Sequence, residues 1–368
     1  MSGMIVAYLY NTQDNELTIL DGDELMSSAP DGADAANKKG APRTGQAHRG
    51  RPQCHTNEMM WVDITNPDAD DFKLLKQRFA LHPMVIEDIK AKEGRPKLHT
   101  YSEYLYLIFH SLQLSSTGVI KEDTPEPHHE GGLELQVSEI DCLVGPDYVV
   151  TLHSVPLKPL DDLRDRWLRN PELMRAGTGY LLYEIMDEVL DDYFPLLDVF
   201  DERIDEFEDR LFSGGEAQLS SDIFSMKRSL LQVRRIAGPT RDVVNTLLRH
   251  DADSGGQNFA YYQDLYDHAV RIVDMIDTFR EILSGALDAY LAIQSNRMNE
   301  VMKTLTSASI ILLVPTLIAG IYGMNFNPEK SPLNMPELNS PYGYPVALGV
   351  MAATIIGLYA YFKRKEWL

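Results

Sequence analysis

Cysteine is nearly absent from this 368-residue sequence, which contains only Cys54 and Cys142 and no CxxC pair. This pattern argues against a disulfide scaffold and is compatible with a reducing compartment. Basic residues are also scarce, since 34 Lys and Arg stand against 55 Asp and Glu to give a net charge of −21. Such a charge repels phosphate groups and attracts cations, so we expect no nucleic-acid partner.

Catalytic and targeting motifs are missing as well. The sequence has no P-loop and no nucleophile elbow, so we expect no enzymatic activity. The adjacent residues His128, His129 and Glu130 lack the spacing of metal ligands. Residues 1–16 have no basic flank and only a short apolar run, which favours a first β-strand over a signal peptide.

Charge is absent from two long stretches near the C-terminus, residues 304–328 and 338–362. Each is longer than the roughly 20 apolar residues that cross a bilayer core, so we interpret them as membrane spans rather than as a buried hairpin of a soluble domain. Lys303 precedes the first stretch, and a basic run at 363–365 follows the second. The positive-inside tendency therefore predicts that both termini are cytoplasmic and that the loop between the spans is external.

The rest of the chain changes character along its length. Strand-like and helical patterns alternate over residues 1–155, which predicts a cytoplasmic α/β domain, and within it the polar segment 21–57 is expected to be a disordered insertion. Residues 156–256 form a cytoplasmic helical region, with one helix expected over about 179–212 and another over about 221–250 that breaks at Gly238-Pro239. The remaining regions are a stalk helix continuing into the first span (257–324), an external loop (325–341), the second span (342–362) and a basic cytoplasmic tail (363–368).

The stalk helix carries a heptad seam, because apolar residues recur at alternating steps of four and three over about four repeats. This pattern predicts a helix that packs lengthwise against other helices. No proline interrupts residues 257–314, so the helix is expected to enter the membrane without a break. The seam consists of Leu265, Ala269, Ile272, Ile276, Phe279, Leu283, Ala286, Tyr290 and Ile293.

Beyond the seam, the same phase continues with small or weakly polar residues. Two interpretations remain open, since small residues permit close helix packing in lipid, whereas several copies of such a helix can surround a water-filled path. Two spans cannot enclose that path alone, so a channel requires a homo-oligomer of cyclic symmetry. This polar stripe consists of Asn299, Met302, Thr306, Ser309, Leu313, Thr316 and Gly320.

Several motifs occur in a fixed order along the chain. They are HPMVIEDI at 82–89, RPK at 95–97, DAYLAIQSNRMNEVMKTLT at 288–306, YGMNF at 322–326, MPEL at 335–338 and the tail KRKEWL. With these motifs the sequence resembles the CorA family of magnesium transporters over nearly its whole length, apart from residues 21–57.

The resemblance implies a funnel-shaped homopentamer in the plasma (inner) membrane of a bacterium or archaeon. In it the α/β domain is cytoplasmic, the stalk helix becomes the pore-lining first span, and the second span packs outside. The outer pore entrance is formed by Gly323, Met324 and Asn325, and Glu337 lies in the external loop. The residues that line or constrict the pore below are Asn299, Met302, Leu305, Leu313 and Thr316.

The residue types suit the implied ion. Mg²⁺ is small and gives up its waters reluctantly, so a ring of Asn325 amides can bind the hydrated ion weakly enough to release it. No carboxylate occurs in residues 304–328, as that logic requires. Rings of Leu305 and Leu313 can gate the path by excluding water.

The family also implies a regulatory Mg²⁺ site between neighbouring subunits, with Asp88 and Asp264 as its residues. Glu87 and Asp187 are weaker candidates for the same network. When internal Mg²⁺ falls, repulsion between facing carboxylates is expected to open the pore. The alternative is that these are ordinary solvated acids.

We therefore predict uptake of hydrated Mg²⁺ driven by the membrane potential and gated by cytoplasmic Mg²⁺, with Co²⁺ and Ni²⁺ as further candidate substrates. One alternative is a zinc transporter on the same scaffold, which the residues alone do not exclude. The other is a non-conducting, membrane-tethered assembly protein, which leaves the polar stripe and Asn325 without a role.

Overall fold

The computed structural model describes residues 4–14, 16–27, 58–92, 94–115, 133–213, 218–325, 330–331 and 333–368. The chain divides into two compact units, Met1–Ala286 and Leu287–Leu368, and each is described by itself. Most of the expected insertion at 21–57 and the His128–Glu130 triplet lie outside the described residues.

The start of the expected insertion is ordered, so that boundary was wrong. Residues Gly22–Ser27 form helix α1, and Leu25 is fully buried. The carboxylate of Asp21 accepts a hydrogen bond from the backbone N–H of Glu24 at 2.9 Å. An aspartate followed three residues later by a glutamate is a capping pattern, and it stabilises the first turn of this short helix.

A seven-stranded mixed sheet organises the first unit. Its order is β2-β1-β3-β7-β6-β5-β4. Only the central pair β3 and β7 is parallel; the other neighbours are antiparallel. The strands are β1 (Met4–Asn11), β2 (Glu16–Asp21), β3 (Glu58–Thr65), β4 (Lys97–Thr100), β5 (Leu105–Leu114), β6 (Leu135–Val144) and β7 (Tyr148–His153).

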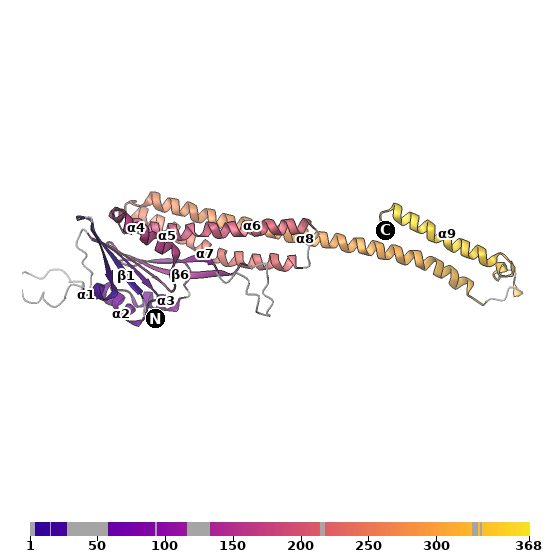
Figure 1. The fold of residues 1–368 in the computed structure, drawn as a ribbon, viewed down its shortest axis with the longest axis horizontal. Coiled ribbons are helices and arrows are strands. Elements are labelled where there is room, and N and C mark those ends of the chain that lie inside the picture. Colours follow the sequence, from indigo (N-terminus) through magenta and orange to yellow (C-terminus); the bar gives the residue numbers. More distant parts are fainter. Residues whose placement is uncertain are drawn as a thin grey trace, which may run out of the picture. The chain divides into compact units, whose positions relative to one another are not determined.

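Helices cover both faces of the sheet (Figure 1). One face packs against α1, α2 (Ala69–Arg78) and α3 (Pro83–Ala91), with Val62, Val150 and Leu75 in the shared core. The other face contacts α5 (Thr178–Asp191), α6 (Tyr193–Phe212) and α7 (Leu219–Asp253). Because both faces are buried, β7 reads as a nearly continuous apolar run instead of alternating.

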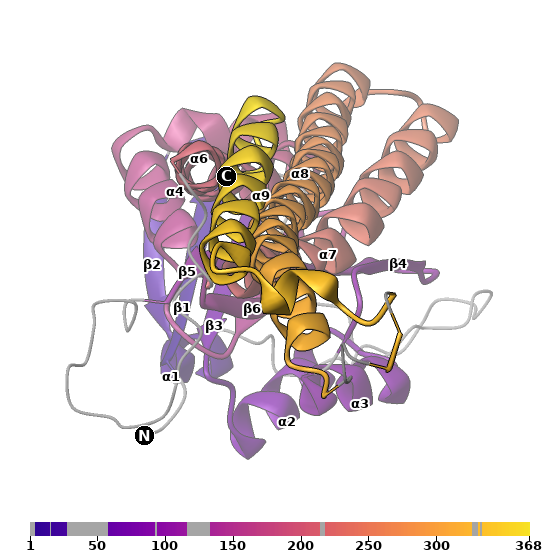
Figure 2. The same ribbon diagram turned by 90° about the vertical axis from the view of Figure 1, so that its right-hand side faces the viewer.

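Helix α3 begins at a well-defined point because His82 caps it and Pro83 occupies its first turn. The ring of His82 accepts a hydrogen bond from the backbone N–H of Met84 at 3.2 Å. Glu87 and Asp88 follow on this helix, and Asp88 contacts Lys97 at the start of β4. Figure 2 shows α2 and α3 on one side of the sheet and α7 on the other.

The remaining helices of this unit correct two expectations. The single helix expected over about 179–212 is two helices, α5 and α6, which meet at Asp192. Pro195 lacks the N–H that would bond to the carbonyl of Asp191, so the break falls one turn before it. Conversely, α7 continues through Pro239 instead of breaking there. Helix α4 (Lys158–Arg169) and the short 3₁₀ helix η3 (Pro171–Ala176) precede α5.

Helix α8 (Phe259–Tyr322) is 64 residues long and carries the predicted seam. The seam is confirmed as a buried stripe, because every member from Leu265 to Tyr290 is at most 8% exposed. Its final member, Ile293, is only partly buried. The heptad pattern therefore marks the face by which α8 packs in the fold.

The second unit contains the C-terminal half of α8, the 3₁₀ helix η5 (Pro336–Asn339) and α9 (Gly343–Arg364). Helix α9 runs antiparallel beside α8 (Figure 1). Hydrogen bonds close both ends of this hairpin, from Tyr322 to Glu337 at 3.2 Å and from Thr304 to the Trp367 carbonyl at 3.4 Å. Both helices contain an apolar window long enough to cross a membrane.

Candidate ion path and regulatory carboxylates

One face of α8 is shielded in the second unit and the opposite face is open. Ser307 is fully buried, and Ile311, Val314 and Ile318 are partly buried. In α9 the residues with reduced exposure are equally periodic: Ala347, Met351, Thr354, Leu358 and Phe362.

The polar stripe lies on the open face of α8. Its members Leu313 and Met302 are 65% and 52% exposed, and Leu305, which is also expected to line the path, is 59% exposed. At about 100° per residue, the centre of the stripe lies about 150° around the helix from the shielded face. The predicted path residues are therefore turned away from α9 in the hairpin.

Two hydroxyl groups on this stripe already use their protons within the helix. Ser309 Oγ donates to the carbonyl of Leu305 at 2.8 Å, and Thr316 Oγ1 donates to that of Leu312 at 2.7 Å. A hydroxyl that donates inward keeps its lone pairs available as acceptors. The stripe thus presents oxygen acceptors, which suit the water shell of a cation.

The predicted pore mouth follows directly on the end of α8. The N–H of Gly323 donates to the carbonyl of Ala319 at 2.9 Å, and a Cβ at position 323 would lie 3.2 Å from that carbonyl oxygen. Glycine therefore allows the helix to close tightly there. Met324 and Asn325 follow and are exposed. The carboxylate held near this end is Glu337, which accepts the bond from Tyr322.

At the other end of the stripe, the C-terminal tail turns back on α8. The N–H of Trp367 donates to the carbonyl of Phe362 at 3.0 Å, and the two rings stack with centroids 5.7 Å apart. Trp367 lines a hollow of about 480 Å³ that also includes Asn299 and Met302. The tail therefore lies beside the residues expected to line the inner end of the path.

The predicted regulatory residue Asp88 has a partner in its own chain. Its Oδ2 atom lies 2.7 Å from Nζ of Lys97, the first residue of β4. Glu87, one residue earlier on α3, is exposed.

A second group of carboxylates lies between α5 and α8. Asp187 Oδ1 is 3.2 Å from Nδ1 of His268, and Asp191 Oδ1 is 3.8 Å from the same nitrogen. The three side chains offer ligand atoms within 4.8 Å of one another, a spacing that can hold a metal ion. Burial and the charge of Asp191 raise the pKa of Asp187 to about 6.

Asp264 lies near this second group, because the hydroxyl of Tyr183 on α5 donates to its carboxylate at 3.3 Å and its charge raises the pKa of Asp187. Asp88 does not, since α3 covers the opposite face of the sheet from α5 (Figure 1). Among the described residues, no hydrogen bond or ion pair joins Asp88 to Asp187 or Asp264.

Sequence reasoning missed Asp191, His268 and Lys97. A helical signal was available for the first two, because Asp191 follows Asp187 by four residues and His268 follows Asp264 by four. Residues four apart share a helix face. Lys97 lies on a strand, nine residues after Asp88 on the preceding helix. No local periodicity reveals the pairing of these two residues.

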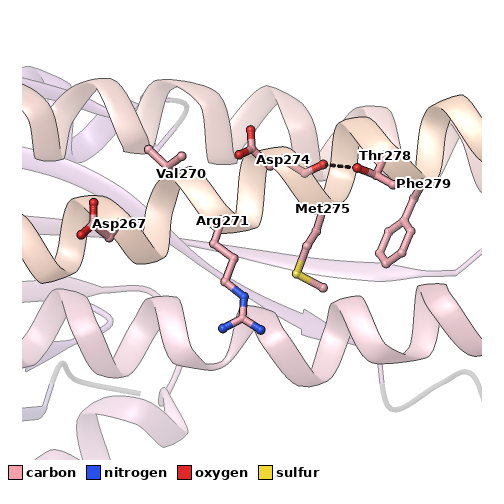
Figure 3. Close-up of a pocket in the computed structure, with 7 residues that line it drawn as sticks. All are labelled: Asp267, Val270, Arg271, Asp274, Met275, Thr278 and Phe279. Carbon is pink, nitrogen blue, oxygen red and sulfur yellow. Dashed lines mark hydrogen bonds between the residues drawn. The ribbon is translucent and has the colours of Figure 1, made fainter.

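Helix α8 also has an open face along the first unit. A hollow of about 360 Å³ is lined by Val270, Met275 and Phe279 together with Asp267, Arg271, Asp274 and Thr278 (Figure 3). The guanidinium of Arg271 lies 5.3 Å from the ring centroid of Phe194 on α6. This face combines apolar and charged side chains and is open in the single chain.

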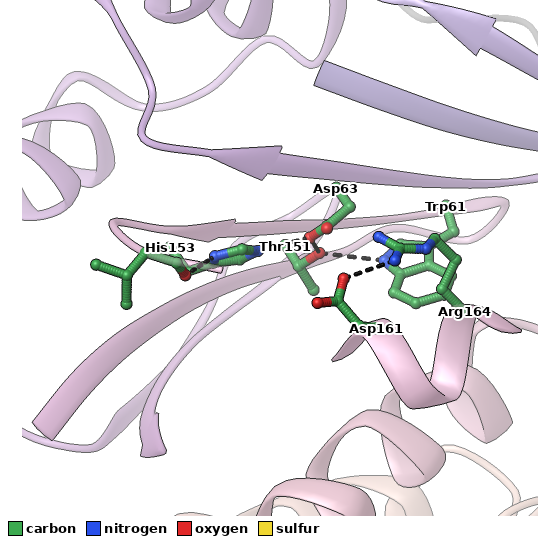
Figure 4. A network of polar contacts seen from close by, with 7 residues as sticks. Trp61, Asp63, Thr151, His153, Asp161 and Arg164 are labelled. Atoms are coloured by element: carbon green, nitrogen blue, oxygen red, sulfur yellow. Dashed lines mark hydrogen bonds and ion pairs between the residues drawn. The ribbon is translucent and has the colours of Figure 1, made fainter. Parts of the chain in front are cut away.

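One set of polar contacts lies within the sheet and another within the neighbouring helix α4 (Figure 4). Thr151 donates to Asp63 at 2.5 Å and accepts from the indole N–H of Trp61 at 3.1 Å. Arg164 pairs with Asp161 at 2.7 Å on α4. These contacts are internal to the domain, and we assign them a structural role.

A family model described as CorA-like Mg²⁺ transporter protein matches residues 56–364. The chain belongs to this family. The resemblance seen in the motifs is thereby confirmed, and as a CorA family member the chain is a membrane protein. The cobalt/magnesium transport protein CorA of Thermotoga maritima is 34% identical over 311 residues, which cover 84% of this chain and 83% of that protein.

Solved structures share the fold of this CorA family member. The complete CorA magnesium transporter of Methanocaldococcus jannaschii matches with a TM-score of 0.73 at 20% identity, covering 99% of each chain. The cytoplasmic domain of ZntB from Vibrio parahaemolyticus matches with a TM-score of 0.56 at 14% identity, covering 81% of this chain and all of that one. The predicted fold class, an α/β domain followed by a long helix and two C-terminal apolar helices, is confirmed.

Proposed function

We propose that the chain is a Mg²⁺ channel whose copies surround an aqueous path lined by α8. The observation that carries this proposal is the position of the polar stripe on the open face of α8, away from α9. That arrangement leaves the acceptor-bearing face free to meet the same face of other copies. Membership in the CorA family supports Mg²⁺ as the ion, with Co²⁺ and Ni²⁺ as further candidates.

The path begins at Asn325, with Gly323 and Met324, and continues along Thr316, Leu313, Leu305, Met302 and Asn299. Amide and hydroxyl oxygens bind the hydrated ion through its water shell, so the ion is not trapped by direct carboxylate ligands. The wide exposed side chains of Leu313 and Leu305 form apolar rings that exclude water when the path is narrow.

The driving force is the membrane potential. A divalent cation gains about 4 to 5 kcal/mol from 100 mV of inside-negative potential, so uptake requires no nucleotide. The basic residues Lys303 and Lys363 flank the spans, which supports cytoplasmic termini and a bacterial or archaeal plasma (inner) membrane. The external loop then includes Glu337.

The chain functions as a homopentamer in this proposal. A single hairpin cannot enclose a path, and cyclic closure of identical subunits is the common solution. The mixed face of α8 around Met275 and Arg271 is available in a single chain for such contacts.

Regulation by cytoplasmic Mg²⁺ is assigned to Asp88 and Asp264, with Glu87 and Asp187 as neighbours. The group formed by Asp187, Asp191 and His268 supports a metal-binding role on the α5 and α8 side. Bound Mg²⁺ neutralises the carboxylates and holds the closed state, and its loss leaves repulsion that favours opening.

The decisive experiment is Mg²⁺ flux into proteoliposomes containing the purified full-length chain. We expect entry that increases with inside-negative potential and is competed by Co²⁺. If Mg²⁺ does not enter under an imposed potential, the proposal is wrong. Zn²⁺ entry without Mg²⁺ entry would favour the zinc alternative, for which the ZntB match supports the fold alone.

A further inference from the structure

The ion pair between Lys97 and Asp88 lies at the boundary between solvent and a buried acidic cluster. The Lys97 side chain is 31% exposed and that of Asp88 is 37% exposed. The carboxylate can therefore be reached by an ion from solvent, although the lysine ammonium is in contact with it at 2.7 Å.

Behind this pair, two more carboxylates face the lysine from β6. Asp141 is 4% exposed and accepts a hydrogen bond from the Tyr106 hydroxyl at 2.7 Å. Glu139 accepts one from the backbone N–H of Gly94 at 2.6 Å, and its side chain is 10% exposed. The ammonium of Lys97 lies 5.9 Å from the centroid of the Tyr106 ring.

Burial is the main reason that the pKa values of Asp141 and Glu139 are raised, and Lys97 lowers both of them. Asp88 acts in the opposite direction on each. One ammonium is therefore placed among three carboxylates, of which only Asp88 is open to solvent.

We infer that Lys97 is a tethered counter-ion that competes with Mg²⁺ for Asp88 and so sets the Mg²⁺ concentration at which the regulatory site fills. This inference rests on the proposed regulatory role of Asp88. A Mg²⁺ ion at either oxygen of this carboxylate is repelled by an ammonium in contact with Oδ2, so binding of the ion favours withdrawal of the lysine.

The withdrawn ammonium has a place to go. The four-carbon stem of lysine is flexible, and its compact charge can move without losing a fixed bidentate geometry. Asp141 and Glu139 continue to attract it, so the charge is not left without a partner. The exchange therefore replaces one neutralising cation of Asp88 by another.

The test titrates Mg²⁺ into full-length wild-type and variant proteins in detergent. Protection from limited proteolysis measures how much Mg²⁺ each protein needs. Lys97→Met is expected to lower the half-protecting Mg²⁺ concentration by about threefold to fivefold, the size of a partly exposed ion pair. Lys97→Gln, which keeps a hydrogen-bond donor, is expected to shift it in the same direction if the Met variant folds poorly. Lys97→Arg should stay near wild type.

The matched control is Lys73→Met, which removes the same charge from another lysine–aspartate pair, 2.6 Å long, on α2. It should leave the half-protecting concentration unchanged. An unchanged or higher concentration in both Lys97→Met and Lys97→Gln would overturn the inference and leave Lys97 as a structural link between α3 and β4. If wild-type protein shows no Mg²⁺ protection at all, the proposed regulatory role itself fails, and this inference fails with it.

Discussion

Nε2 of His153 lies 3.1 Å from Oδ1 of Asp63, while Nδ1 of the same ring lies 2.6 Å from the carbonyl oxygen of Val155. A carbonyl and an ionised carboxylate can only accept hydrogen bonds, so both ring nitrogens must donate. The geometry therefore favours the imidazolium form of His153, although the residue is only 4% exposed. It links the end of β7 to β3 at the centre of the sheet.

Stability should consequently depend on pH through this ring. Burial lowers the pKa of His153, but the hydrogen bond and the charge of Asp63 raise it by more. The pKa of the folded protein's ring is therefore above the ordinary 6.5. A group whose pKa is raised by folding contributes its full stabilisation to the folded protein when the pH is below the pKa of the unfolded state. This contribution is lost as the pH rises through the pKa of the folded state. We expect the midpoint of thermal unfolding of the first unit to fall as pH rises above about 6.5.

The control for this effect is His153→Gln, which should be less stable at low pH and should show a weaker pH dependence. Asp63→Asn should lower the free energy of unfolding by about 1 to 3 kcal/mol, because it removes the carboxylate that contacts both Thr151 and His153. Identical pH profiles for wild type and His153→Gln would show that the ring is neutral throughout.

Asn325→Ala should abolish Mg²⁺ flux in proteoliposomes while the oligomer remains intact. The amide is the polar group expected to bind the hydrated ion at the mouth, and it is exposed directly after α8 ends. Flux is measured with an internal Mg²⁺ indicator, and assembly by size-exclusion chromatography with light scattering. Asn334→Ala, which removes an amide from the connecting loop, should retain flux. Normal transport by Asn325→Ala would remove this residue from the path.

Cysteine accessibility can test which face of α8 lines the path. In a Cys54→Ser background, the variants Leu313→Cys and Thr316→Cys should react with a small water-soluble thiol reagent. The modified side chains should then block flux. Cysteines at Val314 and Ile318 are matched controls, because they lie on the shielded face and should react slowly. Cys142 is fully buried and should not contribute. Faster reaction at Val314 than at Leu313 would reverse the assignment of the faces.

The sequence alone predicted the features that depend on local periodicity. The seam from Leu265 to Tyr290 follows from the heptad pattern, because that spacing keeps one helix face in contact with a partner. The two apolar helices follow from runs without charge. The pore-lining role of the first span, with the second span outside, was implied by the family resemblance, and the position of Leu313 away from α9 agrees with it.

Features that depend on contacts between distant segments could not be predicted. The pairing of Asp88 with Lys97 depends on where β4 lies beside α3. The contact of Asp187 with His268 joins α5 to α8 over a separation of 81 positions in the sequence. The break between α5 and α6 is different, since Pro195 was visible but its effect within a first turn is ambiguous. Likewise Pro239 did not end α7.

Asp264→Lys should blunt the inhibition of flux by Mg²⁺ on the cytoplasmic side. The exposed carboxylate accepts a hydrogen bond from the Tyr183 hydroxyl at 3.3 Å and lies near the group around Asp187 and His268. A lysine there replaces a Mg²⁺ ligand by a permanent positive charge, which repels the ion. We expect the concentration for half-inhibition to rise by at least about tenfold, equivalent to about 1.4 kcal/mol of lost binding.

Asp205→Lys provides the matched control, because this exposed aspartate on α6 makes the same change in net charge and belongs neither to the group around His268 nor to the hollow on α8. It should leave half-inhibition nearly unchanged, since surface charges separated by solvent are screened at physiological ionic strength. Equal effects of the two substitutions would mean that inhibition responds to the overall field of the acidic domain. An effect confined to Asp264→Lys would assign Mg²⁺ sensing to the carboxylate that Tyr183 holds.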